Sequence, residues 1–168
     1  QLDPSVLVAA ADYNWNGSHF DRMANLVETI SGLPSLRHVL LTRVHGDETG
    51  ADPIHEAAMA LAGLPVTVEG LPESMAEQTG VAPEYARLPF DHPAYVLFSS
   101  GTTGKPKCLI HRAGGVLLKH LTEVGLHSDC GTGDRMMFYS TTSWMMWNWQ
   151  VSSLATGAAL VMHDGAAN

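Results

Sequence analysis

The apolar pattern of the first 44 residues constrains the fold more than any other feature of the chain. Two continuous apolar runs, within residues 6–11 and 37–44, flank a stretch in which apolar residues recur at helical spacing. Such runs are typical of buried strands, and the spacing between them predicts an amphipathic helix capped by Ser18. The helical positions are Phe20, Met23, Leu26, Val27 and Ile30. Because a strand–helix–strand unit joins parallel strands, we expect an α/β fold with a layered, mostly parallel sheet flanked by helices.

The rest of the chain is predicted to contain a connector and a second regular part. Residues 63–92 hold four prolines, which favours an irregular connector with at most a short helix near 73–78. The predicted organisation is therefore a strand–helix–strand unit at 1–62, a connector at 63–93 and a final part at 94–168. Further strands are predicted at 94–98, 108–110, 136–139 and 158–162, and further helices at 54–61, 115–125 and 144–154.

The charge distribution indicates where an anionic ligand would bind. The net charge of −8 disfavours nucleic acid as a partner, and no apolar run approaches the roughly 20 residues that cross a bilayer, so no membrane partner is expected. Residues 92–122 contain no acidic side chain. The basic residues of this window are Lys105, Lys107, Arg112 and Lys119. A basic window in an acidic chain is suited to a polyanion.

Cysteine and histidine usage argues against disulfides and metal centres. The two cysteines, Cys108 and Cys130, do not form a disulfide framework or a CxxC pair, which is typical of a reducing, cytoplasmic setting. The nine histidines lack metal-binding spacing, although His120 and His127 could share a helix face.

A loop within the basic window has the composition of a phosphate-binding site. Serine, threonine and glycine fill positions 99–104, and two lysines follow. Glycines allow backbone N–H groups to approach an anion, lysines supply positive charge, and hydroxyls can bind phosphate oxygens or Mg²⁺. The candidate phosphate-binding residues are Ser99, Ser100, Gly101, Thr102, Thr103, Gly104, Lys105 and Lys107, and the candidate Mg²⁺ ligands are Thr102 and Thr103. A Walker A motif is excluded, because it requires glycine at position 99 and serine or threonine at position 106.

At these residues the chain resembles the adenylate-forming superfamily, whose phosphate-loop signature matches residues 99–107. Further segments resemble the acetoacetyl-CoA synthetase family within it. These segments are Leu88–Pro93, His111–Gly115, Trp144–Trp149 and Ala155–Ala159. The resemblance covers essentially the whole chain.

The resemblance implies an AMP-forming ligase that activates acetoacetate with ATP and Mg²⁺ and transfers the acyl group to coenzyme A. It implies that Trp144, Met145 and Met146 lie near the acyl pocket, whereas Trp147 and Trp149 are expected in the core of a buried helix. The lysine that promotes adenylation, the later signatures and the C-terminal domain have no counterpart here. No catalytic residue is therefore assigned, and we expect an inactive fragment whose partners are small-molecule substrates and the remainder of its parent chain.

Two other interpretations stay open at this stage. The parent enzyme could be an acyl-CoA synthetase for another short-chain acid, because Ser143 stands where the family usually has glycine before the tryptophan. Alternatively, the chain could be a non-catalytic nucleotide-binding module.

Overall fold

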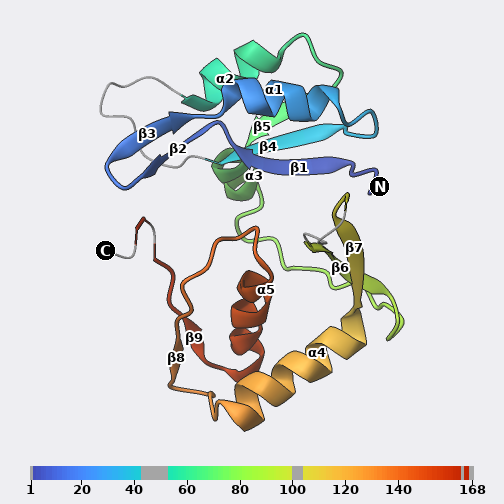
Figure 1. Cartoon of the computed structure of the whole chain (residues 1–168), viewed down its shortest axis with the longest axis vertical. Helices are drawn as coiled ribbons and strands as arrows, with labels where there is room; N and C mark the ends of the chain where they lie inside the picture. Colours follow the sequence, from blue (N-terminus) through green and yellow to red (C-terminus); the bar gives the residue numbers. More distant parts are fainter. Residues whose placement is uncertain (1, 43–52, 100–103, 164, 167–168) are drawn as a thin grey trace. The chain divides into compact units, whose positions relative to one another are not determined.

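The computed structural model describes residues 2–42, 53–99, 104–163 and 165–166 (Figure 1). The chain divides into two compact units, residues 1–83 and residues 84–167, and we describe each by itself.

The first unit contains the parallel sheet that the apolar runs predict. Strands β1 (Val6–Ala10), β4 (His38–Thr42) and β5 (Thr67–Gly70) lie in the order β1-β4-β5, and both pairs are parallel. Helices α1 (Met23–Ser31) and α2 (Pro53–Leu61) lie over one side of this sheet, and α3 (Leu71–Glu77) lies on the other (Figure 1). The predicted strand–helix–strand unit and the layered α/β class are confirmed.

The core of this unit lies between the central strand and the two helices on one side. Val39 and Leu41 of β4 are almost completely buried, as expected for a strand with neighbours on both edges. They pack with Leu26 and Ile30 of α1, which are four residues apart and therefore on one helix face. The buried side chains of Leu36, Ala57 and Leu61 complete the cluster.

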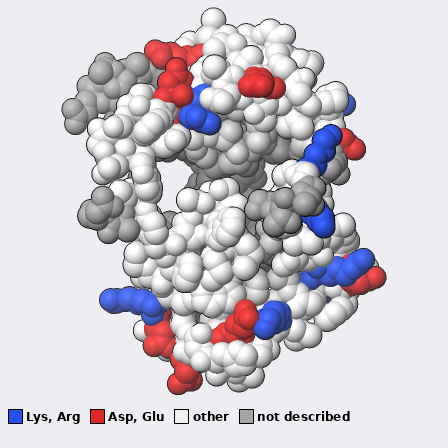
Figure 2. Space-filling model, in the orientation of Figure 1, with Lys and Arg blue, Asp and Glu red and all other residues white. Residues whose placement is uncertain are grey.

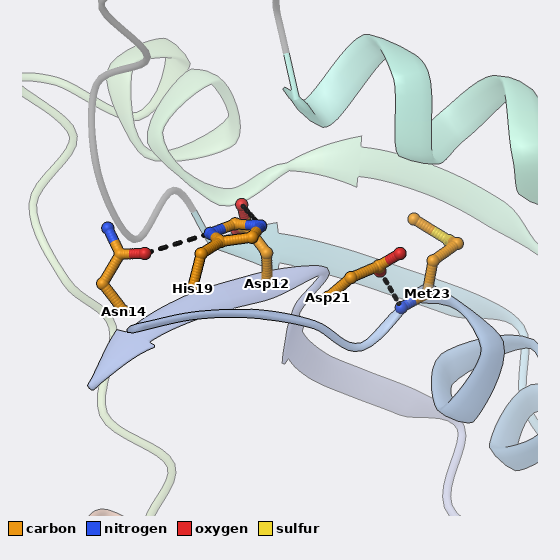
Figure 3. Close-up of polar contacts among 5 residues, drawn as sticks. All are labelled: Asp12, Asn14, His19, Asp21 and Met23. Atoms are coloured by element: carbon orange, nitrogen blue, oxygen red, sulfur yellow. Dashed lines mark hydrogen bonds and ion pairs between the residues drawn. The ribbon is translucent and has the colours of Figure 1, made fainter. Parts of the chain in front are cut away.

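Two local predictions for this unit are wrong. Ser18 does not cap α1, because it begins β3 (Ser18–Asp21), which pairs with β2 (Asp12–Trp15) in a hairpin turned at Asn16 and Gly17. The Asp21 carboxylate instead accepts a hydrogen bond of 2.8 Å from the Met23 N–H at the start of α1 (Figure 3). The stretch 63–93 is more regular than predicted, since it supplies the unpredicted strand β5 to this unit, whereas the short helix predicted near 73–78 is present as α3.

The second unit contains an antiparallel hairpin, and two helical segments supply most of its other regular structure. Strands β6 (Pro93–Ser99) and β7 (Lys107–Arg112) form the hairpin, and α4 (Ala113–Leu121) follows and continues as the π-helical turn Thr122–His127. Helix α5 (Met145–Val151) continues as the 3₁₀ turn Ser152–Thr156. Strands β8 (Arg135–Met136) and β9 (Ala159–Leu160) are parallel but much shorter than predicted.

Candidate active site

The predicted phosphate loop connects the two strands of the β6–β7 hairpin. Ser99, the last residue of β6, is the register partner of Lys107, the first residue of β7. The hairpin therefore brings together the two ends of the loop. Gly104 has a φ of +128°, a backbone conformation that residues with a Cβ rarely adopt. Lys105 and Lys107 are exposed, so their ammonium groups are accessible to an anion.

The other four predicted phosphate-binding residues, Ser100, Gly101, Thr102 and Thr103, lie outside the described residues. The two candidate Mg²⁺ ligands are among them. Within the part of the chain that the structure describes, no group of three or more His, Cys, Asp or Glu side chains is suited to a metal ion. His120 and His127 therefore belong to no such group.

Two of the sequence segments that carry the resemblance meet at the start of α4. The N–H groups of Ala113 and Gly114 donate to the carbonyls of His92 and Phe90 at 2.8 and 2.9 Å. The Arg112 guanidinium donates to the Asp91 carbonyl at 2.5 Å. The segment before β6 thus satisfies N–H groups that the first turn of a helix leaves without partners. This attachment fixes α4 to the base of the hairpin that carries the loop.

A cavity of about 700 Å³ lies beside α4 and α5 in this unit. A volume of this size is typical of small-molecule sites. Its lining combines the apolar surface of α5 with a polar face of α4. The lining residues are His111, Arg112, Gly115, Val116, Lys119, His120, Glu123, His127, Ser128, Met145, Met146 and Trp149.

Two of the three predicted acyl-pocket residues line this cavity. Met145 and Met146 do so from the first turn of α5, whereas Trp144 precedes that helix, is 65% exposed and is not part of the lining. Trp149, expected in the core, lines the cavity and contacts Phe138 edge to face at a centroid distance of 5.8 Å. The helical spacing could have identified it, because Trp149 is three and four residues beyond the two methionines.

The polar face of α4 was not identified as a site from the sequence. His120 is 5% exposed, and its Nδ1 lies 2.7 Å from the Ser152 hydroxyl. Burial lowers the pKa of His120, an effect that the nearby Glu123 carboxylate opposes. Lys119 and Glu123, four residues apart, form an ion pair of 2.8 Å, and the hydrogen bond from Lys119 lowers the pKa of Glu123. These cavity residues recur at intervals of three and four, which is the signal that an analysis of the sequence could have used.

Uncharged side chains cover most of the face drawn in Figure 2, where acidic and basic groups occur close together. Several large apolar residues of the second unit are exposed, among them Phe98, Leu109, Ile110, Leu118 and Leu126.

Comparison with known proteins identifies the family to which this arrangement belongs. Residues 37–168 match the family described as "AMP-binding enzyme". An α/β chain with a glycine-, serine- and threonine-rich loop between two strands is consistent with that class of nucleotide-using enzymes. The chain belongs to the AMP-binding enzyme family.

Individual relatives show which members of this family the chain is similar to. The chain is 38% identical over 169 residues to acetoacetyl-CoA synthetase from Mus musculus, covering 99% of this chain and 24% of that protein. It is 34% identical to a malonamoyl-CoA synthetase from Penicillium aethiopicum, covering 99% of this chain and 22% of that protein. The solved structure of acetoacetyl-CoA synthetase from Streptomyces lividans matches with a TM-score of 0.76 and 37% identity, covering 98% of this chain and 23% of that one. The resemblance to acetoacetyl-CoA synthetases is confirmed.

The chain spans about a quarter of the length of these relatives. Among the described residues, no helix has the length and apolar character required to cross a membrane.

Proposed function

We propose that this chain forms the phosphate-loop and acyl-pocket part of an ATP-dependent acid–thiol ligase that activates acetoacetate and transfers it to coenzyme A. The observation that carries the proposal is the loop of residues 99–107, held at both ends by the Ser99–Lys107 strand pair in a chain of the AMP-binding enzyme family. The similarity to acetoacetyl-CoA synthetases supports the choice of acid and thiol.

The proposed reaction has two steps. A carboxylate oxygen of the acid attacks the α-phosphorus of ATP, which releases pyrophosphate and gives an acyl-adenylate. The coenzyme A thiol then attacks the acyl carbon, loses its proton and displaces AMP. The contribution of the loop is to position the triphosphate and neutralise its charge.

Lys105 and Lys107 are proposed to contact the β- and γ-phosphates. Their exposed ammonium groups can each contribute about 1.5–3 kcal/mol through charge-assisted hydrogen bonds. The hydroxyl groups and N–H groups of residues 99–104 would donate to the same oxygens. Hydroxyl oxygen is a ligand type that Mg²⁺ accepts, so Thr102 and Thr103 are the proposed Mg²⁺ ligands. Bound Mg²⁺ would supply further neutralisation of the phosphate charge.

The cavity beside α4 and α5 is proposed as the acyl site. Met145 and Met146 supply an adaptable apolar wall, and Arg112 and Lys119 lie on the same lining as cationic groups. Trp144 is proposed to contact the acyl group in the complete enzyme, because its indole is exposed next to Met145. The groups that complete the reaction lie in the remainder of the parent enzyme, so we propose that the 168-residue chain is inactive alone.

A second candidate is a ligase for another short acid. The 34% identity with a malonamoyl-CoA synthetase favours it, since that relative is named for a different short acyl group. For either activity we propose a reducing, cytoplasmic location, because the sequence has two cysteines and no CxxC pair.

The test is ATP–pyrophosphate exchange by the full-length protein that contains these 168 residues, with acetoacetate, malonamate, acetate and butyrate. We expect exchange that is fastest with acetoacetate. Faster exchange with malonamate supports the second candidate, and an absence of exchange with every acid contradicts the ligase proposal.

A companion variant tests the role of the loop. Lys107→Ala should weaken ATP binding about tenfold or more, since it removes one charge-assisted hydrogen bond. Arg135→Ala, which removes an exposed cation of the same unit on β8, is the matched control and should leave ATP binding unchanged. Equal ATP affinity in both variants contradicts the assignment of Lys107.

A further inference from the structure

His120, which lines the cavity, begins a series of hydrogen bonds that the proposed reaction does not use. The His120 Nδ1 lies 2.7 Å from the Ser152 Oγ, and the Ser152 Oγ donates to the Asn148 carbonyl at 2.9 Å. His120 and Asn148 are 5% and 7% exposed. These two hydrogen bonds therefore link α4 to the end of α5, and the residues at both ends are buried.

The end of α5 determines the direction of these bonds. A carbonyl oxygen can only accept, so the contact of 2.9 Å between the Ser152 Oγ and the Asn148 carbonyl is a hydrogen bond that the serine donates. A serine hydroxyl has a single proton. Because that proton points to Asn148, the Ser152 oxygen must accept from His120, and the proton of the imidazole is on Nδ1.

The opposite edge of the imidazole is then an unprotonated nitrogen. His120 lines the cavity whereas Ser152 does not, so the ring turns its Nδ1 edge away from the cavity lining. Among the described residues, Nε2 has no hydrogen-bond partner. Burial lowers the pKa of His120 and keeps the ring neutral near pH 7. Nε2 is thus a neutral hydrogen-bond acceptor in a cavity whose charged side chains are Arg112, Lys119 and Glu123, and the Glu123 carboxylate is paired with Lys119 at 2.8 Å.

We propose that His120 is a specificity-determining residue that recognises a hydrogen-bond donor at the distal end of a short acyl substrate, and that Ser152 is the positioning residue that fixes its tautomer. The proposal rests on the proposed function in its second form, a ligase for another short acid, because it assumes that the cavity holds the acyl group and because acetoacetate has no hydrogen-bond donor at its distal end. Substrates of the matching class are short acids with an amide N–H beyond the second carbon. Malonamate is the smallest of these, and it differs from acetoacetate only by NH₂ in place of CH₃.

This isosteric pair gives a sharp test with the full-length protein. Relative to wild type, His120→Phe keeps a ring but removes the acceptor, and should lower the ratio of kcat/KM for malonamate to that for acetoacetate about fivefold. This factor corresponds to a net hydrogen bond of about 1 kcal/mol. Ser152→Ala removes the acceptor of the Nδ1–H bond, so the ring proton can move to Nε2, which then donates to a carbonyl. The same ratio of kcat/KM values should therefore fall by a similar factor.

Thr122→Val is the matched control. The Thr122 hydroxyl also donates to the carbonyl four residues earlier, that of Leu118, at 2.8 Å, but Thr122 does not line the cavity. Its ratio should equal that of the wild type. A ratio unchanged in both His120→Phe and Ser152→Ala overturns the proposal, whereas an absence of activity with every acid in the wild type refutes the proposed function instead.

The tautomer itself can be measured on the 168-residue chain without any activity. Long-range ¹H–¹⁵N NMR correlations of the His120 ring at pH 7.5 should show the proton on Nδ1. They should show it on Nε2 in Ser152→Ala. A proton on Nε2 in the wild-type ring overturns the proposal, even if neither variant folds.

Discussion

The close approach of Phe90 to Gly114 allows a quantitative prediction about the attachment of α4. A Cβ added at Gly114 would overlap three carbons of the Phe90 ring, whereas one added at Gly115 has no atom within 4 Å. Overpacking costs about 1–3 kcal/mol, and alanine is favoured over glycine in a helix by up to about 1 kcal/mol. Gly114→Ala should therefore lower the free energy of unfolding by about 0–2 kcal/mol, and Gly115→Ala should raise it by up to about 1 kcal/mol.

A double-mutant cycle isolates the contact. With Phe90→Ala already present, Gly114→Ala loses its steric cost and should become as stabilising as Gly115→Ala, which gives a coupling free energy of about 1–3 kcal/mol. Urea unfolding followed by tryptophan fluorescence reports on the second unit, because three of the four tryptophans lie in it. If Gly114→Ala stabilises the chain as much as Gly115→Ala while Phe90 is intact, the packing that joins the two segments is refuted.

Three further predictions concern single side chains. Asp21→Ala removes the hydrogen bond to the Met23 N–H and should cost about 1 kcal/mol in a urea melt, while a loss below about 0.3 kcal/mol would contradict a stabilising role for this bond. Gly157→Ala places a Cβ 2.5 Å from the Thr132 Oγ1 at a φ of +86°, and should lower the unfolding free energy by about 1–3 kcal/mol; an unchanged urea midpoint would count against this strain. Burial lowers the pKa of His120 in the folded state, so the unfolded state binds the proton more readily and stability should fall as pH drops below about 6.5. His120→Gln should flatten this part of the stability profile, and an identical profile in variant and wild type would contradict it.

Much of the first unit could be predicted from the sequence, because its strands are continuous apolar runs. The parallel pairing of β1 with β4 follows from the intervening helix. Strand β5 was missed because its four residues, Thr67–Gly70, include only one aliphatic side chain and lie between prolines. Ser18 was assigned to a cap because serine is common there, but the Asn16–Gly17 turn favours a hairpin instead.

The candidate site was predictable where it depends on local sequence. The loop of residues 99–107 and the methionine pair at the start of α5 are short segments that can be recognised without a fold. The His120–Ser152 contact joins residues 32 positions apart, so it depends on the packing of α4 against the end of α5. Trp149 was assigned to the core because a sequence pattern shows which residues share a helix face, not whether that face meets a cavity or other side chains.

The most direct test of the proposed ligase follows oxygen from the acid into the nucleotide. The full-length protein would be supplied with acetoacetate labelled with ¹⁸O in its carboxylate, together with ATP and coenzyme A, and the products analysed by mass spectrometry. Attack of the carboxylate on the α-phosphorus, followed by thiol displacement, predicts one ¹⁸O atom in the phosphate of AMP. Label in inorganic phosphate, or acetoacetyl-CoA formed with unlabelled AMP, would contradict the account.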